Sequence, residues 1–480
     1  MATPYPTTGA HAPDAPPAAM QPGSPVWTRA TAGPGARDMA SDAAPTPRIP
    51  RQPATLADTG LAPAFLEALA CKLLHRLAIE HLAALADALC LPVALTADLV
   101  ERLRQRRLVE ALGRAPEMGG SGAGAGMRWT LTEAGRVHAL EALARSAYVG
   151  AAPVPLADLA AQAASQSVRA LALRRPALER ALAGLVIAPA LLERLGPAAN
   201  AGGSILLYGP PGNGKSSIAA ALARAAAGHV WLPRAVEVDG QVIALYDTAL
   251  HRALGDGAIE AATGGAGALR RSRLPDRRYV ACERPRITAA GELTLDMLDL
   301  APRPGGGSGA HEAPLQLKAL GGVLLIDDFG RQRQHPQEIM NRLVLALESR
   351  RDVLAVASGR TVEVPFDCLV ILSTNIAPTT LLDAGALRRL GYKIHVAAPD
   401  RGAYLRILAE AAAATGLALD EAVVTHLLVD RYEGEGRQMQ AFHPRFLCDQ
   451  ALAICAFEGI APALTRAVLA QAWTNLFPAA

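Results

Sequence analysis

The stretch that decides the fold is SILLYGPPGNGKSS, Ser204–Ser217, in which an apolar run leads directly into glycines, prolines, one lysine and two serines. The apolar run is typical of a buried strand, and the Ala-rich stretch after Ser217 has the pattern of a helix. Glycine allows a backbone to turn sharply and allows another molecule to approach it closely. The stretch therefore predicts a strand, a tight loop and a helix, with a binding site at the loop.

The loop matches the spacing G-x-x-x-x-G-K-[S/T] in full, in the strand-to-helix context that the motif requires. Its backbone N–H groups and the N-terminus of the following helix attract phosphate. We expect Lys215 to reach the β- and γ-phosphates of ATP, and Ser216 to ligate Mg²⁺. The predicted phosphate-binding residues are Gly209, Pro210, Pro211, Gly212, Asn213, Gly214, Lys215, Ser216 and Ser217.

Two later apolar stretches end in polar residues that complement this loop. GGVLLIDDFG ends in Asp327 and Asp328, and two carboxylates at the end of a buried strand are costly without a cation. We expect Asp327 to hold Mg²⁺ through water and Asp328 to orient or deprotonate the attacking water. FDCLVILSTN ends in Asn375, which would lie beside the γ-phosphate and position the water.

A pair of arginines, Arg388 and Arg389, follows the strand of Asn375. An arginine supplied across a subunit interface neutralises charge in the transition state, an effect worth about 10³- to 10⁵-fold in rate. The residue pattern alone leaves these two arginines equally compatible with an ordinary surface.

From about residue 182 to residue 480 the chain resembles an AAA+ ATPase. GPPGNGKS resembles its Walker A motif, LLIDD its Walker B motif, ILSTN its sensor-1 strand and ALRR its arginine-finger segment. FHPRFL resembles the sensor-2 motif, which implies that Arg445 contacts the nucleotide from a helical lid. The second Walker B acid is usually glutamate but is Asp328 here. The resemblance favours Arg389 as the finger, with Arg388 as the alternative.

Two features narrow the resemblance. LKALGGVLLIDD and a predicted β-hairpin over 350–370, turning at Ser358-Gly359, resemble MoxR-like, chelatase-like and enhancer-binding AAA+ proteins. With the N-terminal region described next, the chain also resembles bacterial predicted ATPases with chaperone activity.

The N-terminal region divides in two. Residues 1–58 are Pro- and Ala-rich, and residues 1–55 hold 12 of the 35 prolines, so we expect a disordered tail. Residues 59–150 show the order helix, turn at Leu91-Pro92, helix, hairpin, helix, which predicts a winged-helix-like domain. Arginines that could bind DNA, or form a solvated face of a protein-binding module, are Arg102, Arg104, Arg106, Arg107 and Arg128.

The rest of the chain is predicted to be α/β. We expect a linker helix over 151–181, a parallel-sheet core over 182–400 with an insertion at about 235–318, and a helical lid over 401–480. The insertion is inferred because 111 residues separate Lys215 from Asp327. It either engages a substrate or is a surface decoration; its basic residues are Arg270, Arg271, Arg273, Arg277 and Arg278.

Composition sets the remaining limits. The 47 Lys and Arg residues nearly balance the 44 Asp and Glu residues, which argues against a wholly basic nucleic-acid binder. The sequence shows no membrane span, no secretory signal and no Cys/His metal spacing, so we expect a cytoplasmic protein with free thiols.

These patterns together predict an Mg²⁺-dependent ATPase that forms a homo-oligomer, a hexameric ring, and remodels a protein partner that the sequence does not name. Two alternatives remain open at this point. One is an ATP-switched regulator or loader that binds DNA through the winged helix, and the other is a nucleotide-binding scaffold that does not hydrolyse ATP.

Overall fold

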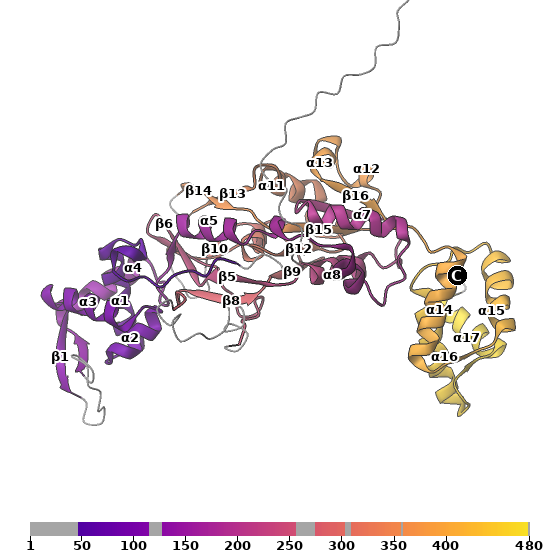
Figure 1. Cartoon of the computed structure of the whole chain (residues 1–480), viewed down its shortest axis with the longest axis horizontal. Coiled ribbons are helices and arrows are strands. Elements are labelled where there is room, and N and C mark those ends of the chain that lie inside the picture. The colour runs from indigo at the N-terminus through magenta and orange to yellow at the C-terminus, as the bar shows by residue number, and fades with distance from the viewer. Residues whose placement is uncertain (1–46, 115–126, 256–273, 303–308, 357–358, 479–480) are drawn as a thin grey trace, which may run out of the picture. The chain divides into compact units, whose positions relative to one another are not determined.

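The computed structural model describes residues 47–114, 127–255, 274–302, 309–356 and 359–478 (Figure 1). The predicted tail at 1–58 therefore lies largely outside the described residues. The central sheet is fully parallel, with the strand order β16-β4-β15-β12-β9. Its strands are β4 (Ser204–Tyr208), β9 (Arg286–Ala289), β12 (Val323–Ile326), β15 (Leu369–Thr374) and β16 (Tyr392–His395).

Both faces of this sheet are buried, as the near-continuous apolar strands predict. Alternate side chains point to opposite faces: Leu206 of β4 packs in one apolar cluster, while Ile205 and Leu207 pack in another. The first cluster includes helix α11 (Pro336–Ser349), and the second includes α8 (Lys215–Ala225). The predicted α/β fold with a doubly covered parallel sheet is confirmed.

The predicted insertion at about 235–318 needs a correction. β9 lies inside that range but pairs with β12 in the central sheet, because Ile287 and Ala289 supply apolar side chains to the core. A second, mixed sheet of order β10-β11-β7-β6-β3 holds most of the inserted strands. The strands of this second sheet are β3 (Val154–Pro155), which precedes the insertion, and β6 (Ala235–Val238), β7 (Gln241–Ala244), β10 (Ala301–Pro302) and β11 (Ala310–Glu312). A separate antiparallel pair joins β5 (His229–Pro233) to β8 (Tyr279–Glu283).

The N-terminal region has the predicted hairpin and final helix, but three helices instead of the predicted two precede the hairpin. It contains α1 (Pro63–Leu77), α2 (Leu82–Leu89), α3 (Val93–Gln105), β1 (Val109–Arg114), β2 (Met127–Leu131) and α4 (Glu133–Arg145), which Figure 1 shows grouped in indigo and purple. The sequence indicated one helix up to Leu91, but the chain also breaks at Ala78, which has φ +49°. Among the described helices no single one is long and apolar enough to cross a membrane. The sharply bent pair α2 and α3 together has the length and apolar composition of a membrane span.

The segment predicted as a linker helix, 151–181, is part of the folded core instead. Its first residues form β3, which pairs with β6. The helix that follows, α5 (Leu156–Ser165), buries Leu159 and Ala163 against the second sheet. The segment ends in α6 (Arg175–Ala181). Burial of these apolar side chains, which a linker would leave in water, explains the difference.

The C-terminal region is helical, as predicted, and has its own apolar core around Tyr404, Tyr432 and Trp473. Its helices are α14 (Arg401–Thr415), α15 (Glu421–His426), the π-helix η5 (Leu427–Glu433), α16 (His443–Glu458) and α17 (Arg466–Leu476), and its two short strands are β17 (Ala418–Leu419) and β18 (Ala463–Leu464). We call this region the lid.

The hairpin predicted before the strand of Asn375 is confirmed. β13 (Arg351–Ala355) and β14 (Thr361–Pro365) pair antiparallel, and the predicted turn residue Ser358 lies outside the described residues. All six cysteines are free, and five of them are buried. The remaining helices are η1 (Ala57–Thr59), η2 (Val168–Ala170), α7 (Pro189–Asn200), η4 (Leu295–Leu298), α10 (Leu315–Lys318), α12 (Pro378–Leu381) and α13 (Ala384–Arg389).

Candidate nucleotide-binding site

The glycine-rich loop connects β4 to α8, as its sequence predicts. Gly214 precedes the first helical residue with φ +81°, a left-handed conformation that glycine adopts without strain. Lys215 is 6% exposed, and its Nζ donates to the carbonyl oxygens of Gly209 at 3.0 Å and Pro210 at 2.7 Å. Burial lowers the pKa of Lys215, and the nearby carboxylates of Asp328 and Asp327 oppose that shift. The lysine thus folds back over its own loop.

The loop and the acidic strand end meet. Ser216 Oγ donates to Asp327 Oδ1 at 2.9 Å, although 111 positions separate the two residues in the sequence. The sheet explains the contact, because β15 lies between β4 and β12 and all three strands end at the same edge. Hydroxyl and carboxylate oxygens are the ligands that Mg²⁺ prefers. The structure therefore brings together the two residues predicted to bind metal.

The second acid and the asparagine also lie side by side. Asn375 Nδ2 lies 3.4 Å from Asp328 Oδ1, across the ends of β15 and β12. Asp328 has φ +47°, a left-handed conformation that few residues other than glycine adopt. Such conformations persist where the surrounding structure holds them, and they concentrate at functional sites. Gln332 provides part of that hold, since its Nε2 donates to the main-chain oxygens of Asp327 and Asp328 at 3.3 Å each.

Ser373 is a further residue of this site that no sequence motif indicated. This residue lies on β15, is 1% exposed, and donates its hydroxyl hydrogen to Asp327 Oδ1. The available signal was its position two residues before Asn375, which places both side chains on the same face of the strand. A serine in an apolar strand is uninformative until its acceptor is known.

A cavity of about 970 Å³ lies beside the loop. Lys215, Asp328 and Asn375 line it from the core, while Arg445 and Phe442 line it from the lid. The segment between α6 and α7, 184–187, supplies an apolar wall. Within this segment Gly184 has φ +88°, and Pro189 begins α7.

The lid is hydrogen-bonded to the loop. Phe442 N donates to Gly212 O at 3.0 Å, and Ala441 N donates to Asn213 Oδ1 at 3.1 Å. The Phe442 ring approaches Gly212 so closely that a Cβ there would lie 2.3 Å from its Cδ1. Any side chain at position 212 would therefore displace the lid segment.

The pocket suits a nucleoside triphosphate with its cation. Asn213 is 6% exposed, and its Nδ2 has no hydrogen-bond partner within the part of the chain that the structure describes. A buried donor without a partner is costly, and a phosphate oxygen would satisfy it. Lys215 supplies positive charge, while Ser216 and Asp327 supply oxygen ligands. These side chains fit both the triphosphate and its cation.

The two candidate finger residues differ in their surroundings. Both lie at the end of α13, but Arg389 Nε donates to Glu348 Oε1 at 2.6 Å, whereas Arg388 is exposed. Arg445 is on α16, with its side chain 82% exposed, and lies 3.9 Å from Asp449 Oδ2. Among the described residues no hydrogen bond or ion pair joins Arg388 or Arg389 to the loop, so a catalytic role for either requires another copy of the chain. Arg445, in contrast, lines the cavity of its own chain.

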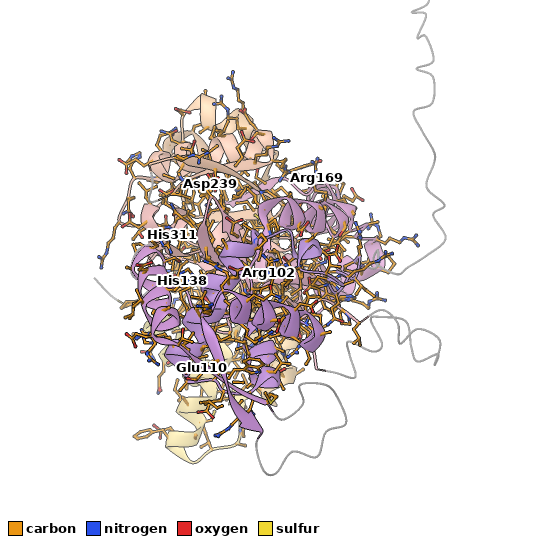
Figure 2. The ribbon with its side chains drawn as sticks, turned by 90° about the vertical axis from the view of Figure 1, so that its left-hand side faces the viewer. Arg102, Glu110, His138, Arg169, Asp239 and His311 are labelled. Atoms are coloured by element: carbon orange, nitrogen blue, oxygen red, sulfur yellow. The ribbon has the colours of Figure 1, made fainter. Side chains whose placement is uncertain are left out.

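The arginines of the N-terminal region are largely paired. Glu67 is 3% exposed and forms ion pairs with two arginines, Arg102 at 3.2 Å and Arg106. Arg102 is labelled in Figure 2. Arg104 pairs with Glu101. Two carboxylates thus pair with three of the five arginines that the sequence offered for DNA binding or a solvated face. At the hairpin, Arg128 pairs with Glu80 at 3.3 Å.

The insertion arginines that the structure describes connect segments within the chain. Arg277 pairs with Asp87 of α2 at 2.8 Å. Arg278 is 3% exposed, pairs with Asp276 at 2.8 Å and donates to Thr59 O at 2.9 Å. The suggestion that Arg278 engages a substrate is therefore wrong, because its guanidinium group is buried and used internally. The side chain of Arg277 is 47% exposed, so a substrate contact by Arg277 stays a prediction. Arg270, Arg271 and Arg273 lie outside the described residues.

Comparisons with known families agree with this geometry. Residues 188–356 match the family described as an AAA ATPase domain, which includes the loop and the acidic pair. Over these residues the chain is similar to AAA ATPase domains. Residues 400–475, which make up most of the lid, match a domain of unknown function (DUF8689). The matched ATPase region ends before Asn375, Arg389 and Arg445, so their roles remain proposals.

Solved structures provide further similarities. NtrX from Brucella abortus is 14% identical, with a TM-score of 0.35 over 58% of this chain and 53% of that chain. Its complex with ATP is also 14% identical, with a TM-score of 0.36 over 60% of this chain and 56% of that chain. The RuvB Holliday junction branch migration motor from Thermotoga maritima is 14% identical, with a TM-score of 0.34 over 62% of this chain and 73% of that chain. The chain thus spans about half the length of NtrX. A search of curated protein sequences gave no significant match.

Proposed function

We propose that this protein hydrolyses ATP with Mg²⁺ at the site between the glycine-rich loop and the lid. The observation that carries the proposal is the 2.9 Å contact between Ser216 Oγ and Asp327 Oδ1, with Lys215 buried beside it. Three residues from two distant parts of the sequence then present the charge and oxygen ligands that a metal-bound triphosphate requires.

Bound Mg²⁺ would neutralise charge on the phosphates and on the developing leaving group. The loop N–H groups and Lys215 bind the phosphates, and Ser216 and Asp327 hold the cation. Asp328 accepts a proton from, or orients, the attacking water. Asn375, whose Nδ2 lies 3.4 Å from Asp328 Oδ1, provides the second hydrogen bond to that water. These roles use only groups that already lie at one edge of the sheet.

The working form in this proposal is a homo-oligomer, a ring of six copies. The resemblance to AAA+ ATPases favours this assembly, and the exposed end of α13 suits it, since Arg388 and Arg389 do not reach the site of their own chain. Arg445 on the lid would contact the nucleotide and connect hydrolysis to lid movement. The work performed is remodelling of a protein partner, as in chaperone-like ATPases.

The DNA-binding alternative has less support. Glu67 pairs with Arg102 and Arg106, and Glu101 pairs with Arg104. Two carboxylates thus offset two of these three positive charges, which reduces the charge available for phosphate contacts. Fluorescence anisotropy with duplex DNA at two salt concentrations tests this alternative. Binding that weakens steeply with salt would restore it, and weak binding without such a dependence would exclude it.

Phosphate release by the full chain with ATP and Mg²⁺ tests the main proposal. We expect Lys215→Ala to abolish nucleotide binding, and Asp328→Asn to bind ATP without hydrolysing it. Unchanged turnover in either variant would overturn the assignment. With ATP, Asp328→Asn should sediment at about six times the 49.9 kDa of one chain.

A further inference from the structure

One oxygen of Asp327 accepts three hydrogen bonds. Its Oδ1 accepts hydrogen bonds from Ser216 Oγ at 2.9 Å, from the backbone N of Asp328 at 3.1 Å, and from Ser373 Oγ. Its Oδ2 accepts none among the described residues. The three donors come from α8, from the chain just after β12 and from β15, so three separate segments converge on this carboxylate.

The sheet fixes the position of Ser373. β15 lies between β4 and β12, and Ser373 pairs with Leu207 of β4, while the preceding Leu372 pairs with Ile326 of β12. Phe329 N donates to Ser373 O at 2.6 Å, which holds the segment after the acidic pair against the same strand. The backbone of Ser373 is therefore held in place, and the register of the sheet fixes the face to which its side chain points.

We propose that Ser373 is a positioning residue for the magnesium site, acting through Asp327; this inference rests on the proposed function. A free carboxylate rotates about its last bond and loses that freedom when it binds a cation. Donors that occupy Oδ1 restrict the rotation in advance. Partners of metal-binding side chains typically change metal affinity by about 10- to 100-fold when they are removed.

Ser373 differs from Ser216 in this role. Ser216 is predicted to bind the cation itself, and so its hydroxyl oxygen is shared between Asp327 and the metal. Ser373 is 1% exposed on a central strand, and among the described residues its hydroxyl hydrogen-bonds only to Asp327. It therefore keeps Asp327 oriented whether or not the cation is present.

The test compares two buried serines of the same sheet in the full chain. Ser373→Ala removes the donor to Asp327. Ser204→Ala is the matched control, because Ser204 is 2% exposed on β4 and its Oγ accepts Gly391 N at 3.1 Å, at the opposite end of the strand. Ser373→Cys, which keeps a side chain of similar size but a poor donor, is the second variant.

Two readouts separate the metal from the nucleotide. The first is the affinity for a fluorescent ATP analogue with EDTA, and the second is Mn²⁺ binding in the presence of ADP, followed by electron paramagnetic resonance. We expect Ser373→Ala and Ser373→Cys to keep the metal-free nucleotide affinity within about twofold and to weaken Mn²⁺ binding by about 10-fold. The Ser204→Ala control should change neither quantity.

Unchanged Mn²⁺ binding in Ser373→Ala and Ser373→Cys would overturn the inference while leaving the proposed ATPase intact. An equal loss in Ser204→Ala, or an equal loss of metal-free nucleotide binding, would also overturn it by indicating a general structural effect. If the unsubstituted chain bound neither Mn²⁺ nor nucleotide, the proposed function itself would fail.

Discussion

Arg389 is held by Glu348 of its own chain, with Nε 2.6 Å from Oε1. Both side chains are partly exposed, at 29% and 49%, and exposed ion pairs contribute only about 0–1 kcal/mol. A phosphate presented by a neighbouring copy would therefore displace Glu348 at little cost. The pair is compatible with a role for Arg389 between subunits, and the structure leaves Arg388 as the exposed alternative.

We predict that Arg389→Ala lowers ATP turnover by about 10³-fold and leaves ATP affinity nearly unchanged, because the arginine acts on transition-state charge. Steady-state phosphate release and nucleotide titration measure the two effects. Arg388→Ala is the control and should reduce turnover by less than about threefold. A large loss of turnover in Arg388→Ala but not in Arg389→Ala would assign the role to Arg388. Normal turnover in both variants would show that neither arginine acts as the finger.

The contact between Gly212 and Phe442 predicts a connection between loop and lid. Gly212→Ala places a methyl group 2.3 Å from the Phe442 ring at a residue with φ +71°. We expect a cost of about 1–3 kcal/mol, seen as weaker ATP binding, because the lid segment must move. Isothermal titration measures it.

The double variant Gly212→Ala/Phe442→Ala separates the steric contact from backbone strain. Removal of the ring relieves the clash, so the two substitutions should cost less together than the sum of their separate effects. Strictly additive losses would mean that the lid segment does not rest on the loop.

The buried pair of Arg278 and Asp276 predicts a large effect on stability. Arg278→Ala leaves a carboxylate that is 2% exposed without its partner, which costs about 3–5 kcal/mol. The adjacent Arg277→Ala removes an exposed pair with Asp87 and should cost about 0–1 kcal/mol. Thermal unfolding of the two variants compares them directly, and equal melting temperatures would contradict the prediction.

His443 predicts a pH dependence of the lid. Its Nδ1 lies 2.8 Å from Tyr432 OH, and burial lowers the pKa of His443 from 6.5 to about 4. Between pH 6.5 and about pH 4, His443 is protonated in the unfolded chain but neutral in the folded chain. The contribution of neutral His443 to the free energy of unfolding is therefore fully present above pH 6.5 and is lost as the pH falls toward 4. The slope is up to about 1.4 kcal/mol per pH unit.

Denaturant unfolding of the full chain between pH 7 and pH 4.5 measures this slope. His443→Asn keeps a hydrogen-bond acceptor near Tyr432 but does not titrate, so the variant should lose that part of the dependence. If both proteins had the same slope, the buried imidazole would not be its source.

Local patterns determined a large part of this protein. The apolar runs at 204–208, 323–326 and 369–374 predicted buried parallel strands, because strands covered on both faces carry few polar residues. The glycine loop, the acidic pair and Asn375 follow those strands directly. Since parallel strands end at one edge of a sheet, their sequence positions were enough to predict that these residues meet.

Only the tertiary structure decided which side chains are used up by partners distant in the chain. The pairing of Arg102 with Glu67, the burial of Arg278 and the contact of Ser373 with Asp327 depend on packing and register across 35 to 219 positions. A periodic pattern shows that a residue is buried or exposed, but it does not name its partner. For the same reason β9 was assigned to the insertion, although its alternating apolar residues complete the edge of the central sheet.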